Sequence, residues 1–70
     1  MDTVSLSPYF SDSEVVNQLR SFFSLTEMWK INFYNLLSQC VDKGEYFELQ
    51  IMKRTFHIDK YTGGVTEVDV

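Results

Sequence analysis

The stretch from Val15 to Val41 most constrains the fold, because one signal for the start of a helix directly precedes it and a second lies inside it. Ser11-Asp12-Ser13-Glu14 and Ser24-Leu25-Thr26-Glu27 both follow the capping-box pattern Ser-x-x-Glu. In this pattern the serine and glutamate side chains satisfy backbone N–H groups that the first turn leaves free. A second cap inside an apolar run predicts a break. We therefore expect two helices, near residues 12–23 and about 25–42.

The first predicted helix is apolar on one side only. Its apolar residues lie at positions i, i+1, i+4, i+7 and i+8: Val15, Val16, Leu19, Phe22 and Phe23. This period of 3.6 residues is typical of a surface helix that covers a core. Phe10 precedes the cap and is placed to pack on Val15 as a hydrophobic staple. Residues 1–10 contain Pro8 and are expected to form an extended or mobile segment.

The second predicted helix is apolar around most of its circumference. One stripe contains Trp29, Phe33, Leu36, Leu37, Cys40 and Val41, and a second contains Leu25, Met28, Ile31 and Tyr34. Lys43 and Gly44 follow as a stop signal. A helix of this kind is normally buried on all sides. A chain of 70 residues offers little interior for it, so we expect its second face to pack against another chain.

The remainder of the chain predicts strands. Phe47, Leu49 and Ile51 alternate with polar residues, and the apolar phase then shifts to Met52, Phe56 and Ile58. A phase shift moves side chains to the other face of a sheet. Because Lys53-Arg54 contains no typical turn residue, a single long bent strand over residues 45–58 is favoured, with two strands and a turn as the alternative.

Thr62-Gly63-Gly64 predicts a second hairpin. A three-residue loop would pair Ile58 with Val68 and Phe56 with Val70, whereas a two-residue loop would place Ile58 opposite Asp69. Apolar cross-strand pairs favour the three-residue loop. The last strand would then run from Val65 to Val70 and could form an exposed edge, which invites pairing with another chain.

These elements predict an α+β fold in which two N-terminal helices pack on a small antiparallel sheet. The order is α-α-β-β, with a third strand as the alternative, in one domain over residues 11–70. A domain of this size gains stability from disulfides, metals or association. The chain has one cysteine and one histidine, which excludes an internal disulfide and a Cys/His zinc site, so association is expected.

The net charge of −4 and the absence of a long apolar run argue against general binding to nucleic acid and against a membrane span. The N-terminus lacks the features of a signal peptide, and a lone thiol is typical of a reducing compartment, so a cytoplasmic location is expected. We expect no enzyme activity, metal or cofactor. Cys40 lies on an apolar stripe and is expected to pack there, and His57 is expected to lie exposed on a strand.

The aromatic surplus indicates a non-enzymatic protein-interaction module. Such a protein would act as a stoichiometric inhibitor, adaptor or regulator of a larger protein, and would form a homodimer. Small acidic chains of this kind are typical of viral and mobile-element proteins. The expected contact residues are Trp29, Phe33, Tyr34, Val65 and Val68, because aromatic anchors and open strand edges are common at interfaces.

Two alternatives stay open from the sequence. The first is a small nucleic-acid-binding or transcription-regulating module that uses the basic and aromatic strand 53–61. Its contacts would be made by Lys53, Arg54, His57 and Lys60, interleaved with aromatic residues on which bases can stack. The second is a small-molecule pocket lined by aromatic residues between the helices of a dimer.

Overall fold

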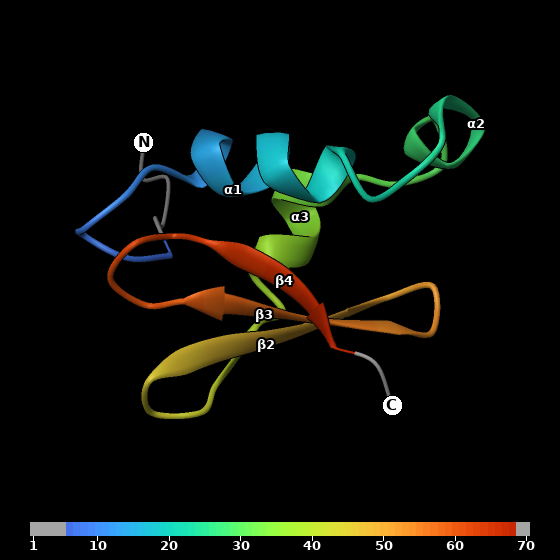
Figure 1. Ribbon diagram of the computed structural model, residues 1–70. Helices are drawn as coiled ribbons and strands as arrows, with labels where there is room; N and C mark the ends of the chain where they lie inside the picture. The colour runs from blue at the N-terminus through green and yellow to red at the C-terminus, as the bar shows by residue number, and fades with distance from the viewer. Residues whose placement is uncertain (1–5, 69–70) are drawn as a thin grey trace.

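Three short helices lie on one side of a four-stranded antiparallel sheet, so the chain has an α+β fold (Figure 1). The computed structural model describes residues 6–68, and the rest of the predicted extended segment and of the last strand lies outside them. The sheet has the strand order β1-β2-β3-β4. The elements are α1 (Asp12–Arg20), α2 (Leu25–Met28), α3 (Phe33–Leu37), β1 (Val41–Asp42), β2 (Tyr46–Ile51), β3 (Arg54–Asp59) and β4 (Val65–Val68).

The predicted start of the first helix is confirmed. The Ser11 hydroxyl accepts a hydrogen bond from the Glu14 backbone N–H, and the Glu14 carboxylate accepts one from the Ser11 N–H at 3.0 Å. Val15, Val16 and Leu19 are fully buried, as their period predicts. The helix ends at Arg20 and the chain continues through a turn to Phe23, so α1 is shorter than the expected span to residue 23.

The prediction of one long second helix over residues 25–42 is wrong. The structure has α2 and α3 in its place, and Val41 and Asp42 form β1. The break spans residues 29–32. It ends at Asn32, whose side chain accepts a hydrogen bond from the Asn35 N–H at 3.2 Å and so begins a new helix. Asparagine is a strong N-cap residue. A long helix would have left one of its apolar faces in water, and without packing an isolated helix is only marginally stable.

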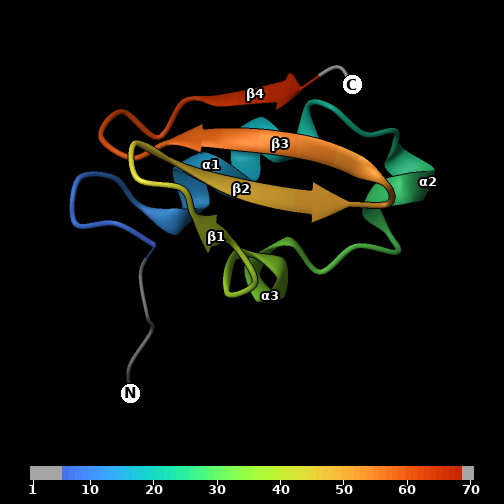
Figure 2. The same ribbon diagram turned by 90° about the horizontal axis from the view of Figure 1, so that it is seen from below.

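Within residues 6–68, the helices all lie on one face of the sheet (Figure 2). That covered face carries the buried apolar residues of β2 and β3: Leu49, Ile51, Phe56 and Ile58. Phe47 pairs with Ile58, Leu49 with Phe56, and Ile51 with Arg54. The single bent strand favoured from the sequence is therefore wrong, and the two-strand alternative is confirmed. A two-residue turn separates the strands, so apolar residues at odd positions of β2 and at even positions of β3 lie on the same face of the sheet. This explains the shift in apolar phase along the sequence.

The turn between β2 and β3 is formed by residues with an unfavourable backbone conformation. Met52 has φ 51° and Lys53 has φ 69°, the left-handed region that costs a non-glycine residue roughly 1–2 kcal/mol. These values match the hairpin turn for which Asn-Gly is preferred. The pairing of apolar residues on the two strands outweighs the local preference of the turn.

Lys53→Gly is expected to stabilise the chain by about 0.5–1 kcal/mol. The change removes the strain of the left-handed conformation and loses part of that gain to the greater freedom of glycine in the unfolded state. Urea unfolding followed by circular dichroism measures the difference. Gln50→Gly is the matched control, because Gln50 is exposed within β2 and glycine there lowers stability. Equal effects of the two substitutions would contradict the assignment of strain to the turn.

The second hairpin has neither of the two predicted registers. Ile58 pairs with Val65 and Phe56 with Glu67, so the expected pairing of Ile58 with Val68 is wrong. The connecting loop is longer, because the Asp59 carboxylate accepts hydrogen bonds from the backbone N–H groups of Tyr61 and Thr62 at 2.8 and 3.0 Å. An aspartate that organises a turn in this way is common, and here it shifts the register of β4.

Aromatic rings fill the core at the end of α1, and one arginine joins them to the sheet. The Arg54 guanidinium lies 4.6 Å from the centroid of the Phe23 ring and donates a hydrogen bond to the Phe22 carbonyl at 3.0 Å. It also donates to both carboxylate oxygens of Glu67, at 2.8 and 2.7 Å. The ring centroids of Phe23 and Phe56 are 5.6 Å apart. Arg54 therefore holds the segment before α2 against β3 and β4.

Stability is expected to fall in acid. Hydrogen bonds from backbone N–H groups lower the pKa of Glu14, Glu27 and Asp59, and those from Arg54 and Lys60 lower the pKa of Glu67 and Asp42. Each group favours its ionised form in the folded chain, so the unfolded chain binds more protons as the pH falls. The free energy of unfolding should be level above the ordinary carboxyl pKa values of about 4 and decline below them.

Urea midpoints measured from neutral pH into strong acid test this expectation. In Glu67→Gln the decline should be less steep, since one of the titrating groups is missing. A midpoint that does not change as the pH falls below the ordinary carboxyl pKa values would contradict the prediction.

Candidate protein-interaction surface

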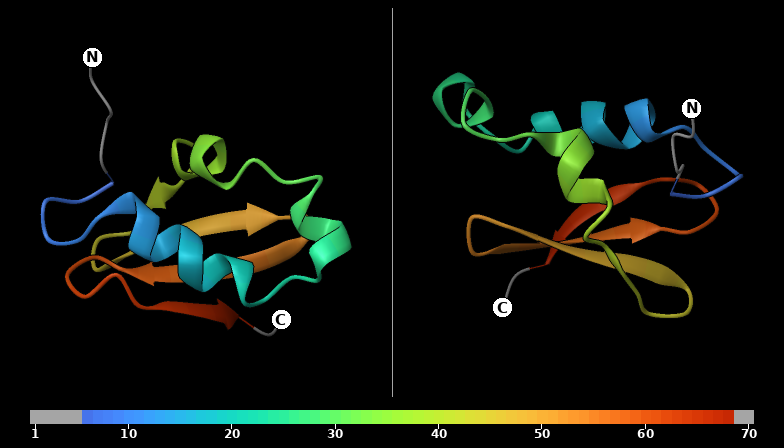
Figure 3. Two further views of the ribbon diagram at one scale, coloured as in Figure 1. Left: turned by 90° about the horizontal axis from the view of Figure 1, so that it is seen from above. Right: turned by 180° about the vertical axis from the view of Figure 1, so that it is seen from behind.

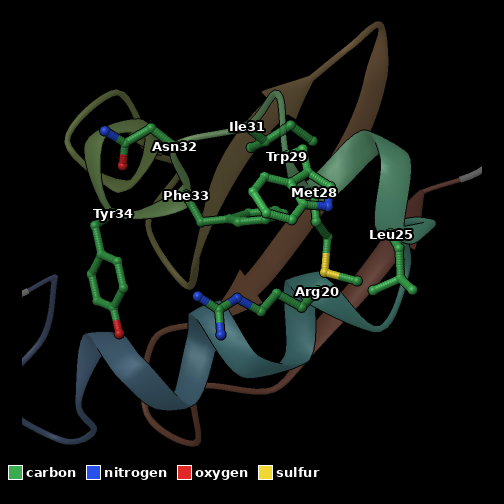
Figure 4. A pocket seen from close by; sticks show the side chains of 8 residues that line it. All are labelled: Arg20, Leu25, Met28, Trp29, Ile31, Asn32, Phe33 and Tyr34. Carbon is green, nitrogen blue, oxygen red and sulfur yellow. The ribbon is translucent and has the colours of Figure 1, made fainter.

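An apolar groove lies between the end of α1, the single turn of α2 and the start of α3 (Figure 4). Its volume is about 500 Å³, which is in the range of sites that hold one or two large side chains. We call it the Trp29 groove, and it is lined by Arg20, Leu25, Met28, Trp29, Ile31, Asn32, Phe33 and Tyr34.

Trp29 is the most exposed large apolar side chain of the described residues. Its exposed fraction is 89 %, and that of Leu25 at the start of α2 is 75 %. Within residues 6–68, the Trp29 ring makes no aromatic stacking or cation–π contact. By contrast, the exposed rings of Tyr9 and Tyr61 pack on each other with centroids 5.1 Å apart. Trp29 thus presents apolar area that no described part of the chain covers.

Local hydrogen bonds, together with the partly buried Met28 side chain, hold α2 in this exposed position. None of its residues is buried. The Glu27 carboxylate accepts from the Ser24 N–H at 2.9 Å, and the Ser24 hydroxyl accepts from the Glu27 N–H at 3.3 Å. The helix projects beyond the end of α1 and lies at the same end of the molecule as the β2–β3 turn (Figures 1 and 3). A capped turn therefore displays Leu25 and Trp29 outside the core.

The structure brings the three predicted helical contact residues together, but not as a stripe on one helix. Trp29 follows α2, whereas Phe33 and Tyr34 begin α3. Phe33 is only 4 % exposed and packs against Phe23, with ring centroids 5.7 Å apart. Phe33 therefore belongs to the core and contributes only a small part of its surface to the groove. Tyr34 is half exposed at the rim.

The predicted strand contacts lie away from the groove. Val65 and Val68 belong to β4, and Val65 is buried. The Gln18 amide accepts a hydrogen bond from the Val65 N–H at 3.0 Å and donates one to the Gly63 carbonyl at 2.8 Å. An added strand would need these backbone groups. The Gln18 side chain, which the sequence did not single out, therefore occupies the backbone groups at the start of the β4 edge.

The basic residues of the nucleic-acid alternative do not share one face. Arg54 lies on the covered face, bound to Glu67, while His57 lies on the open face, stacked on Tyr46 at 4.1 Å between centroids. The Lys60 Nζ donates to Asp42 and to the Gly44 carbonyl at 2.8 Å. The four residues thus form no continuous basic strip of the kind that follows a phosphate backbone.

The one cysteine and the one histidine, which a catalytic pair would need, lie on different sides of the sheet. Cys40 packs against the core under the helices, and burial raises the pKa of its thiol to about 11. A thiol of this kind is almost fully protonated at neutral pH and is a poor nucleophile. His57 lies on the open face beside Glu48, with 3.7 Å between Nε2 and Oε2. Residues 6–68 contain no group of three potential metal-ligating side chains.

No protein-family model, curated protein or solved structure matches the chain. Within residues 6–68, none of the helices has the length and apolar character needed to cross a membrane.

Proposed function

We propose that the protein is a non-enzymatic interaction module that binds a larger protein through the Trp29 groove and acts as its inhibitor, adaptor or regulator. The observation that carries this proposal is the exposed Trp29 beside a groove of about 500 Å³. Tryptophan is the residue type most enriched among the anchors of protein interfaces. Contiguous exposed apolar residues mark interaction sites more often than scattered ones do.

The core is complete without these residues, which supports a role in binding rather than in folding. The buried cluster is built from α1, α3, the covered face of the sheet and the flanking Phe10 and Phe23, and neither Leu25 nor Trp29 belongs to it. The Ser24–Glu27 capping box stabilises α2, a helix at the surface with no buried residue. The position of α2 is set by Ser24, Glu27 and the neighbouring Arg54 contact with the Phe22 carbonyl.

Trp29→Ala is expected to weaken partner binding by about 30-fold or more, which corresponds to the roughly 2 kcal/mol lost at an interface hot spot. The wild-type chain and the variant would be immobilised and compared for the proteins they capture from host cells, and each captured protein would then be titrated in purified form. The expected result is a partner that binds the wild-type chain and is lost with the variant.

Tyr61→Ala is the matched control, since Tyr61 is a 60 % exposed aromatic residue outside the groove. It should capture the same partner as the wild-type chain. If the Trp29 variant retains every captured protein, the proposal is wrong.

Self-association stays a prediction. The expectation rests on the small size of the domain and on the second apolar face of one long helix, and that helix is replaced by α2 and α3. Light scattering over a wide concentration range tests it, and a stable monomer at micromolar concentration would contradict it.

A further inference from the structure

A second groove, lined by four apolar and four polar residues, adjoins the Trp29 groove at the same end of the molecule. It lies between the segment after α2, the start of α3 and the β2–β3 turn, and its volume is about 290 Å³. Ile31 and Asn32 line both grooves and form the boundary between them. We call it the Met52 groove, and it is lined by Lys30, Ile31, Asn32, Asn35, Leu36, Gln50, Ile51 and Met52.

The shape of this combined surface fits an extended apolar partner rather than a single side chain. Met28 lies in one groove and Met52 in the other, and Met52 is half exposed at the tip of the strained turn. Methionine is flexible and polarizable, so it adapts to varied apolar partners. Two adjoining grooves can hold two anchor side chains of one amphipathic segment.

The charges along the two grooves are all positive. Arg20 is the only charged residue that lines the Trp29 groove, and Lys30 is the only one that lines the Met52 groove. Within residues 6–68 neither forms an ion pair. Glu27 lies near enough for Lys30 to lower its pKa, but its carboxylate is hydrogen-bonded to the Ser24 cap. The chain as a whole carries −4, so this surface differs in sign from the rest of the protein.

We infer that the occupant of the two grooves is an acidic amphipathic segment of another protein. Its apolar side chains would fill the grooves, and its carboxylates would contact Arg20 and Lys30. This inference rests on the proposed function and adds the chemistry of the partner. Complementary charge selects such a segment over neutral and basic ones.

A second copy of the chain fits this surface less well. In a two-fold dimer the same patch meets itself, so the cations of one copy would face those of the other. Like charges across an interface are unfavourable. Nucleic acid also fits poorly, because apolar grooves with two cations offer little to a phosphate backbone.

A library of short random peptides displayed on phage tests the inference without assuming a sequence. Peptides would be selected on the full wild-type chain and counter-selected on Trp29→Ala. The expected pool is enriched in aspartate and glutamate between apolar residues. A tryptophan-free peptide from the pool should shift the fluorescence of Trp29, the one tryptophan of the chain, to shorter wavelength.

Arg20→Gln combined with Lys30→Gln should weaken binding of that peptide by about tenfold, because two exposed ion pairs with its carboxylates are lost. Added salt should weaken it as well. Lys43→Gln is the matched control, because Lys43 is an exposed cation that lines neither groove, and it should bind like the wild-type chain.

If the selected peptides depend on Trp29 but are neutral or basic, the inference of an acidic partner is wrong and the proposed function is still supported. The absence of any Trp29-dependent pool would overturn both. A fluorescence shift that appears with rising protein concentration and no peptide would identify a second copy as the occupant and would also overturn the inference.

Discussion

Phe56→Ala is expected to lower the free energy of unfolding by about 3–5 kcal/mol, the range for aromatic-to-alanine changes in a core. The Phe56 side chain is fully buried on β3. Its ring contacts those of Phe22 and Phe23, with centroids 5.2 and 5.6 Å away. The cavity left by alanine would lie between the sheet and the end of α1, where neither layer can collapse freely.

This loss is large compared with the whole stability of such a domain. At roughly 0.05–0.15 kcal/mol per residue, a chain of 70 residues has on the order of 4–10 kcal/mol. Phe56→Ala should therefore leave a substantial unfolded population at room temperature. Urea or thermal unfolding followed by circular dichroism measures the change.

Trp29→Ala is the matched control for Phe56→Ala, because it also removes a large aromatic side chain. Since Trp29 is 89 % exposed, its truncation should change stability by less than about 0.5 kcal/mol. Similar losses for the two variants would show that Trp29 supports the fold and would contradict its assignment to a binding surface.

Gly63→Ala is expected to lower the free energy of unfolding by about 2–5 kcal/mol. Gly63 has φ 76°, and a Cβ atom there would lie 2.8 Å from Cγ of the buried Phe10 ring. The left-handed backbone contributes roughly 1–2 kcal/mol, and the displacement of a packed ring contributes a further 1–3 kcal/mol. Because Cγ lies at the base of the ring, Phe10 cannot avoid the new methyl group by a small rotation.

Gly44→Ala separates these two contributions. Gly44 also has a positive φ, 105°, but a Cβ atom there would meet nothing within 4 Å. Its substitution should therefore show the backbone cost alone, and the loss for Gly63→Ala should be clearly greater. Equal losses at the two sites would mean that Phe10 does not pack on the loop as the structure shows.

The elements that sequence reasoning predicted well are those specified by neighbouring residues. The capping boxes at Ser11 and Ser24 form with the predicted hydrogen bonds, because their partners lie three residues away. The apolar stripe of α1 was found for the same reason. The Asn32 cap was missed, although asparagine three residues before Asn35, in the middle of an apolar run, is a recognisable signal.

The elements predicted wrongly depend on pairing between strands rather than on the preference of single residues. The Met52–Lys53 turn has no local preference for its conformation, and it forms because Leu49 and Ile51 on β2 pair with Phe56 and Arg54 on β3. The register of β4 follows from the Asp59 turn together with two contacts between distant segments. Arg54 draws the Glu67 carboxylate toward the end of α1, and the Gln18 amide binds the backbone at Val65.

By itself, the sequence determined the α+β class, the starts of two helices and the presence of more large apolar side chains than a small core can hold. Only the tertiary structure decided which of these side chains remain outside. Phe33 points into the core, whereas Trp29, four residues earlier, stays in water, because the helix breaks at Asn32 between them. Whether the residues before or after this break enter the core depends on the space between α1 and the sheet. That space is set by packing between segments that are distant in sequence.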